Sequence, residues 1–185
     1  MKLLASTMVI GLGLAISQQA HAAPQINVTL GSGAVADFES TSTDGCTHTT
    51  GQLVVLKATP GAELANGLYV TGMQEDLCDG TFGNGFAGYV AGGYVIPLIT
   101  AGFSGTVVAD SYSGGAPVTL ELDLRWFGTG AITRTGGVFD DGSTISLDWS
   151  RSRGARTAGQ FDVDGAAATV SSASLVFQAT GTITR

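Results

Sequence analysis

The 185-residue chain carries 15 acidic residues against 8 lysines and arginines, which gives a formal net charge of -7, and 28 of its residues are glycine. A surface of this charge repels nucleic acid and anionic lipid at long range, because binding to phosphates requires basic side chains that displace counterions. The composition therefore argues against nucleic-acid binding, and its many Gly, Thr, Ser and Val residues favour strands and turns over helices.

Residues 1–22 have the layout of a cleavable signal peptide. Lys2 supplies a positive start, residues 3–16 are almost wholly apolar, and the small residues Ala20 and Ala22 precede the predicted cut. A membrane helix is the alternative, but the apolar segment is short for a span and no stop-transfer charges follow it. We therefore expect a secreted or periplasmic protein with one domain over residues 23–185 and no transmembrane helix after signal removal.

Alternation of apolar and polar residues predicts strands along the whole mature chain. They lie at 26–30, 34–38, 53–56, 68–71, 103–112, 118–127, 132–139, 145–149, 160–163 and 175–183, with Gly, Asp or Asn in most of the connections. The clearest is 118–127, where five apolar residues from Val118 to Trp126 alternate with Thr119, Glu121, Asp123 and Arg125. Residues 151–156 are predicted to be a basic loop.

About ten short strands with tight turns predict an all-β fold, which we interpret as an antiparallel β-sandwich of two sheets. The alternative is a small closed β-barrel of the outer-membrane kind, for which the length and the alternation are adequate. Few aromatic residues are available for the two girdles that such a barrel carries. The sandwich is therefore the preferred prediction.

Cys46 and Cys78 are the only cysteines of the chain. An even number of cysteines in an exported protein predicts a disulfide, which stabilises a loop of this size by roughly 3–4 kcal/mol. A redox pair or a thiolate metal site is the alternative. No Cys-x-x-Cys spacing exists and only His48 remains after signal removal, so the structural disulfide is favoured.

No complete catalytic set is visible in the sequence. His48 is the only base for a serine nucleophile and no Gly-x-Ser-x-Gly motif is present. Glu121 and Asp123 lie on one side of a strand and could serve a carboxylate-based glycan hydrolase or lyase, although such residues are also typical of a solvated face. No catalytic residue is assigned.

Two groups of side chains are candidates for ligand contact. Asp140, Asp141, Asp162 and Asp164 are oxygen ligands of the kind that Ca²⁺ prefers, but Asp-Gly is also the pair that tight hairpins require. Arg151, Arg153 and Arg156 could hold an anionic group or a glycan through their guanidinium groups, or pair with nearby aspartates. A sugar-stacking platform would also need an exposed aromatic ring, and the alternation does not identify one.

The two cysteines, together with the segment from Asp123 to Gly130 that contains Trp126, Gly128 and Gly130, resemble a group of exported bacterial all-β proteins. These share two cysteines in the first half and a strand that ends in Trp-x-Gly-x-Gly. The resemblance implies an intact β domain and no particular activity.

The leading functional hypothesis is a non-catalytic secreted or cell-surface module that binds a protein, a glycan or copies of itself. The first alternative is the carboxylate-based glycan hydrolase or lyase, and the second is the outer-membrane barrel. No cofactor is predicted, apart from the candidate Ca²⁺.

Overall fold

The computed structural model describes residues 25–59, 65–81 and 83–184, and the predicted signal peptide, residues 1–22, lies outside this range. Within these residues the chain forms ten β-strands and no helix. The strands are β1 (Gln25–Thr41), β2 (Thr47–Ala58), β3 (Gly67–Asp76), β4 (Gly85–Ala91), β5 (Tyr94–Ile96), β6 (Thr100–Ser111), β7 (Val118–Gly128), β8 (Thr133–Asp140), β9 (Thr144–Val163) and β10 (Ala166–Thr184). Across the same residues, no helix has the length and hydrophobicity that a membrane crossing requires.

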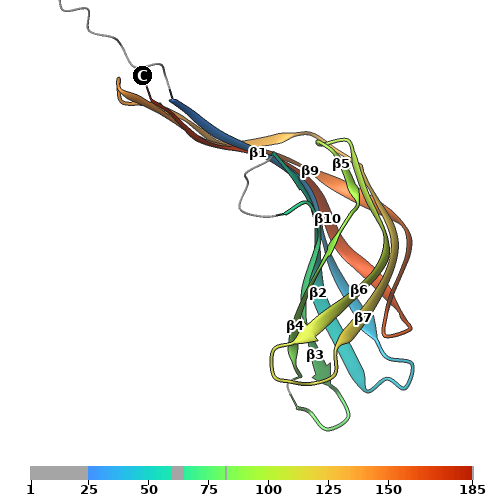
Figure 1. Cartoon of the computed structure of the whole chain (residues 1–185). Helices are drawn as coiled ribbons and strands as arrows, with labels where there is room; N and C mark the ends of the chain where they lie inside the picture. Colours follow the sequence, from blue (N-terminus) through green and yellow to red (C-terminus); the bar gives the residue numbers. More distant parts are fainter. Residues whose placement is uncertain (1–24, 60–64, 82, 185) are drawn as a thin grey trace, which may run out of the picture.

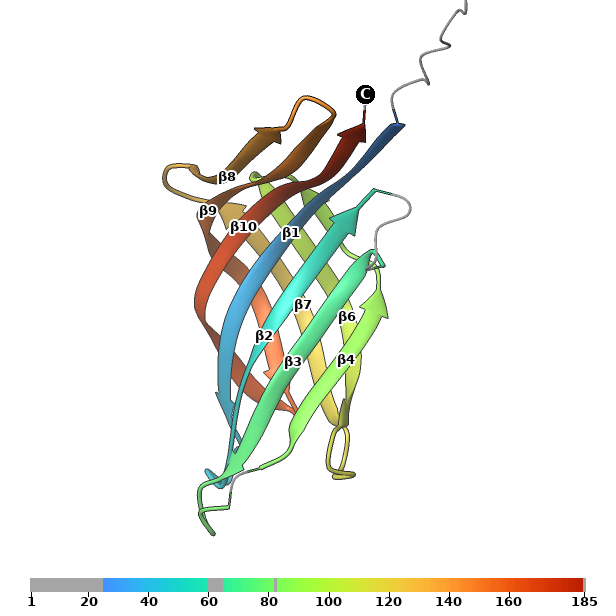
Figure 2. The same ribbon diagram turned by 90° about the vertical axis from the view of Figure 1, so that its left-hand side faces the viewer.

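All ten strands are antiparallel members of one sheet, in the order β10-β1-β2-β3-β4-β6-β7-β9-β8, with β5 paired to β6. β9 also pairs with β10, so the sheet folds into two layers that are joined along both sides. One layer consists of β10, β1, β2, β3 and β4, and β6, β7 and β9 lie behind it (Figure 2). The junctions are irregular, because β4 pairs with β6 through two residue pairs and β9 shifts its register against β10.

The core lies between the two layers. β7 has the alternation that the sequence predicts, with Val118, Leu120, Leu122, Leu124 and Trp126 buried. The facing layer contributes the buried side chains of Leu53, Val55, Leu68, Val70 and Phe86. Phe38 of β1 meets Phe161 of β9 edge to face with ring centroids 4.9 Å apart, which ties the two layers together through the core.

Four strands continue past the body as a projecting arm, which Figure 1 shows extending from the rest of the molecule toward the C-terminus. We define the arm as residues 25–30 of β1, 133–140 of β8, 144–150 of β9 and 179–184 of β10. Their order across the arm is β8-β9-β10-β1. β2 pairs with β1 only from Gly31 onward, so both β8 and the start of β1 are edge strands here.

The predicted all-β antiparallel fold of about ten strands is confirmed, and the two layers are parts of one continuous sheet. The predicted basic loop at 151–156 is wrong. These residues lie within β9, which joins the two short strands predicted at 145–149 and 160–163. The main-chain hydrogen bonds of a ladder do not depend on side-chain polarity, so β8, β10 and β7 pair with this polar segment as with any other.

Candidate functional site: a polar groove on the outer face

Three neighbouring hollows lie on the outer face of β6, β7 and β9, and Asp123 lines all of them. Their volumes are about 360, 250 and 160 Å³. We call the three together the outer groove. The largest hollow is lined by Ser104, Gly105, Thr106, Glu121, Leu122, Asp123, Gln160 and Asp162.

The polar side of β7 supplies the middle of the outer groove. Since successive side chains of a strand point to opposite faces, burying Leu122 and Leu124 turns Glu121, Asp123 and Arg125 outward. Directly opposed residues of neighbouring strands share a face, and Asp162 of β9 is opposite Glu121. Three carboxylates therefore lie on one open face of the sheet.

The polar side chains of β6 and β9 complete this part of the groove. Ser104 of β6 and Gln160 of β9 lie on either side of Asp123, and Thr106 lies beside Glu121. Hydroxyl and amide groups both donate and accept hydrogen bonds, whereas carboxylates only accept them. The groove therefore offers both kinds of partner to a polar ligand.

Strands β7 and β9 approach each other closely at Gly159, which lines the hollow beside Arg125. This residue has φ of +126°, and a Cβ atom there would overlap the carbonyl oxygen of Asp123 on β7. A side chain at this position would strain the backbone and force β9 away from β7 next to the hollow that Gly159 lines. The close approach of the two strands thus depends on a glycine that no polar motif marks in the sequence.

An aromatic ring lies at each end of the groove. Tyr94 of β5 is 45% exposed, and its ring covers Gly102, where any side chain would collide with it. At the other end Phe127 carries the guanidinium of Arg156 over its ring, 4.8 Å from the centroid. Sequence reasoning missed Tyr94, whose one signal was its position after the Gly92-Gly93 pair and beside the buried Val95.

Comparison with family models, with curated proteins and with solved structures found no match. The groove itself is therefore the basis for any functional proposal.

The four candidate calcium ligands do not come together in one place. Asp140 and Asp141 lie at the start of the β8–β9 turn, while Asp162 lies near the far end of the 20-residue strand β9 and Asp164 lies in the turn that follows it. Asp141 accepts main-chain hydrogen bonds from Thr144 and Ser143, which hold the pKa of its carboxyl below the ordinary value. Across the described residues no group of three or more His, Cys, Asp and Glu side chains has a metal-binding arrangement.

The three candidate arginines also separate. Arg151 and Arg153 lie on the side of β9 that continues the inner face, and Arg156 lies on the outer face beside the groove. Arg153 donates to the carbonyl oxygens of Leu98, Thr129 and Gly130 at 3.0–3.3 Å, which holds the loops at this end of the body together. Of these three arginines, only Arg156 lies beside the outer groove, where Arg125 of β7 also lines two of the hollows.

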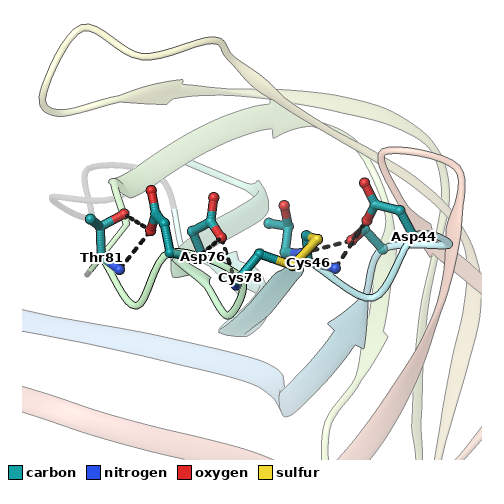
Figure 3. The surroundings of a disulfide bond; sticks show 8 residues. Asp44, Cys46, Asp76, Cys78 and Thr81 are labelled. Atoms are coloured by element: carbon teal, nitrogen blue, oxygen red, sulfur yellow. Dashed lines mark hydrogen bonds between the residues drawn. A yellow bond between two sulfur atoms is a disulfide. The ribbon is translucent and has the colours of Figure 1, made fainter.

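The predicted disulfide is present, with a Cys46–Cys78 bond that joins the β1–β2 loop to the β3–β4 loop (Figure 3). Asp44 accepts hydrogen bonds from the Ser42 hydroxyl and the Cys46 N–H, and Asp79 accepts from the hydroxyl and the N–H of Thr81. In each case the hydroxyl contributes most to lowering the carboxyl pKa. The carboxylates here hold turns in place.

A second polar pocket, of about 280 Å³, lies at the same end of the body as the disulfide. It is lined by Ser40, Ser42, Thr43, Thr47, Thr49, Gln74, Val163, Asp164 and Ala166. The Ser40 hydroxyl lies 3.3 and 3.2 Å from the Ala166 and Ala167 carbonyl oxygens, and the Gln74 amide donates to Asp164 at 3.2 Å. Because these groups bond mainly to one another, we interpret their role as holding the strand ends and turns together at this end of the body.

Proposed function

We propose that this protein is an exported, non-catalytic module that binds an oligosaccharide along the outer groove. The observation that carries the proposal is the combination of a hydrogen-bonding floor, centred on Asp123, with the exposed ring of Tyr94 beside it. A sugar presents hydroxyl groups at its rim and C–H groups on its face, so it can use both features at once.

The charge of the groove favours neutral sugars or amino sugars. Glu121, Asp123 and Asp162 outnumber Arg125 on the floor, and the whole chain carries a net charge of -7. Sulfated or carboxylated glycans would be repelled by the acidic floor of the groove and by the net negative charge of the chain. Arg151, Arg153 and Arg156, the candidate contacts for an anionic glycan, do not form one group.

The arrangement supports binding over glycan hydrolysis. Hydrolysis of a glycosidic bond uses two carboxyl groups that flank the bond from opposite sides. Glu121, Asp123 and Asp162 project side by side from one sheet surface, so a sugar would lie on top of all three. We therefore expect no turnover.

Export is part of the same proposal. Its support is the signal-peptide pattern of residues 1–22 and the disulfide, a bond that persists in oxidising compartments. The periplasm and the cell exterior both fit these two observations.

Isothermal titration with neutral and amino-sugar oligosaccharides tests the binding function. Tyr94→Ala and Asp123→Asn should each weaken binding about tenfold, the size expected for one lost stacking contact or charge-assisted hydrogen bond. Tyr112→Ala is the matched control, since Tyr112 is an exposed aromatic residue (74%) outside the groove. Unchanged affinity in Tyr94→Ala, or release of shorter sugars by the wild type, would contradict the proposal.

A further inference from the structure

The arm has an apolar face. Directly paired residues form rows across it, and one row consists of Val138 of β8, Leu147 of β9, Gly181 of β10 and Val28 of β1. The next row on the same face contains Trp149, Ala179 and Leu30. The reverse face carries Ser146, Asp148, Thr180 and Thr182, together with the exposed Phe139 opposite Ser146, so the arm is amphipathic with one aromatic side chain on its polar side.

This apolar face continues the inner face of the body, where the second layer of the sheet covers it. Leu175 of β10 is fully buried in the core, and Ala179 and Ile183 follow on the same side of the same strand. In the arm the covering layer has ended (Figure 1). Val138 is 61% exposed and Leu30 is 39% exposed, and neither belongs to the hydrophobic core.

Charge is distributed along the arm with opposite signs at its two ends. Arg134 of β8 is directly opposite Arg151 of β9 at the base, and like charges in that position destabilise a ladder. Asp140 and Asp141 lie at the tip, six or seven residues from Arg134, a separation of about 20 Å along a strand. The apolar rows lie between the two charged ends.

We propose that the apolar face of the arm packs against the same face of a second copy of this chain, related by a two-fold axis. Such a contact is self-complementary, since the two arms run in opposite directions and each acidic tip meets the other copy's Arg134 and Arg151. Each contact then places the two carboxylates of one copy beside the two guanidinium groups of the other. This inference is independent of the oligosaccharide proposal.

The size of the face fits a weak dimer. Four strands spaced about 4.8 Å apart and six to eight residues long at about 3.3 Å each cover roughly 400–450 Å² per copy. The two copies together would bury roughly 800–900 Å², which is below the size of a stable specific interface and typical of transient association. The dimer is therefore expected at micromolar concentrations and above.

Sedimentation velocity of the purified protein, from about 5 to about 500 μM, tests the proposal across the range where weak interfaces assemble. The wild type should shift from monomer to dimer as the concentration rises. Leu147→Glu places a charge in the apolar row and should raise the dissociation constant at least about tenfold. Ser146→Glu, its neighbour on the reverse face, is the matched control and should dimerise like the wild type.

Charge reversal at the base gives a second readout. The double substitution Arg134→Glu/Arg151→Glu should also weaken the dimer, because each acidic tip then meets glutamates, while circular dichroism confirms that both variants are folded. A wild type that stays monomeric throughout the range would overturn the proposal, as would equal dissociation constants for Leu147→Glu and Ser146→Glu. Cosedimentation of a monomeric wild type with phosphatidylcholine vesicles would assign the face to lipid and would equally overturn it.

Discussion

Asp164 and Thr119 are joined by two hydrogen bonds that link the β9–β10 turn to the start of β7. The Thr119 N–H donates to Asp164 Oδ1 at 2.8 Å, and the Asp164 N–H donates to the Thr119 carbonyl oxygen at 2.8 Å. Asp164 and Gly165 form the two-residue turn between Val163 and Ala166, with φ of 49° and 77°. These values are typical of the type I′ hairpin turn, for which Asp-Gly is a preferred pair.

Substitution of Asp164 tests this link. Asp164→Ala removes the acceptor for the Thr119 N–H and places alanine at a positive φ, so it should destabilise the protein by about 1–3 kcal/mol. Asp164→Asn keeps a side-chain oxygen and tolerates the same φ, so its loss should be smaller. Urea unfolding followed by tryptophan fluorescence measures both. Equal losses for the two variants would contradict this role of the carboxyl oxygen.

Removal of the disulfide should lower stability without changing the fold. Cys46 and Cys78 are 32 residues apart in the sequence, and opening a loop of that size should cost about 3–4 kcal/mol through the entropy of the unfolded chain. The double variant Cys46→Ser/Cys78→Ser should show this loss in urea unfolding. Adding dithiothreitol should lower the midpoint of the wild type alone, and a wild type that is insensitive to full reduction would argue against a stabilising role.

The two loops that carry the disulfide should weaken in acid. Hydrogen bonds from Ser42 and Thr81 hold the pKa values of Asp44 and Asp79 below the ordinary value of 3.8. Since the folded pKa is lower than the unfolded one, the stabilisation is complete above the unfolded pKa and is lost as the pH falls through the folded pKa.

Urea midpoints measured from about pH 6 to about pH 2 test this, because the window spans the pKa of an ordinary aspartate. The wild-type midpoint should fall below about pH 4, where these carboxylates begin to take up protons. The variant Asp44→Asn/Asp79→Asn should be less stable at pH 6 and less sensitive to acid. Identical slopes in the two proteins would rule out a contribution from these carboxylates.

The close approach of β7 and β9 should depend on Gly159. Gly159→Ala forces a side chain into a φ of +126° and against the Asp123 carbonyl oxygen, so it should destabilise the protein by about 1–3 kcal/mol. Gly154→Ala on the same strand is the control, because the nearest atom to its added Cβ is 3.5 Å away. Thermal unfolding of both variants distinguishes them. A Gly159→Ala variant as stable as Gly154→Ala would mean that the strands separate there at little cost.

The sequence was sufficient where neighbouring residues decide the structure. Alternation from Val118 to Trp126 predicts the buried and exposed sides of β7, and the Asp-Gly pair at 164–165 predicts a turn. Two cysteines in a chain with a signal-peptide pattern predict the disulfide. The strand and the turn follow from residues that are adjacent in the sequence, and the disulfide follows because the chain has no other cysteines.

The tertiary structure was needed to determine which strands pair and in which register. No local signal places Asp162 opposite Glu121, puts the ring of Tyr94 over Gly102, or makes β9 a single strand through Arg151, Arg153 and Arg156. The alternation of apolar and polar residues determines which side of a strand is buried, because this depends only on the order of residues along the strand. Register and layer order depend on hydrogen bonds between distant segments, so the groove and the open face of the arm exist only once the sheet has assembled.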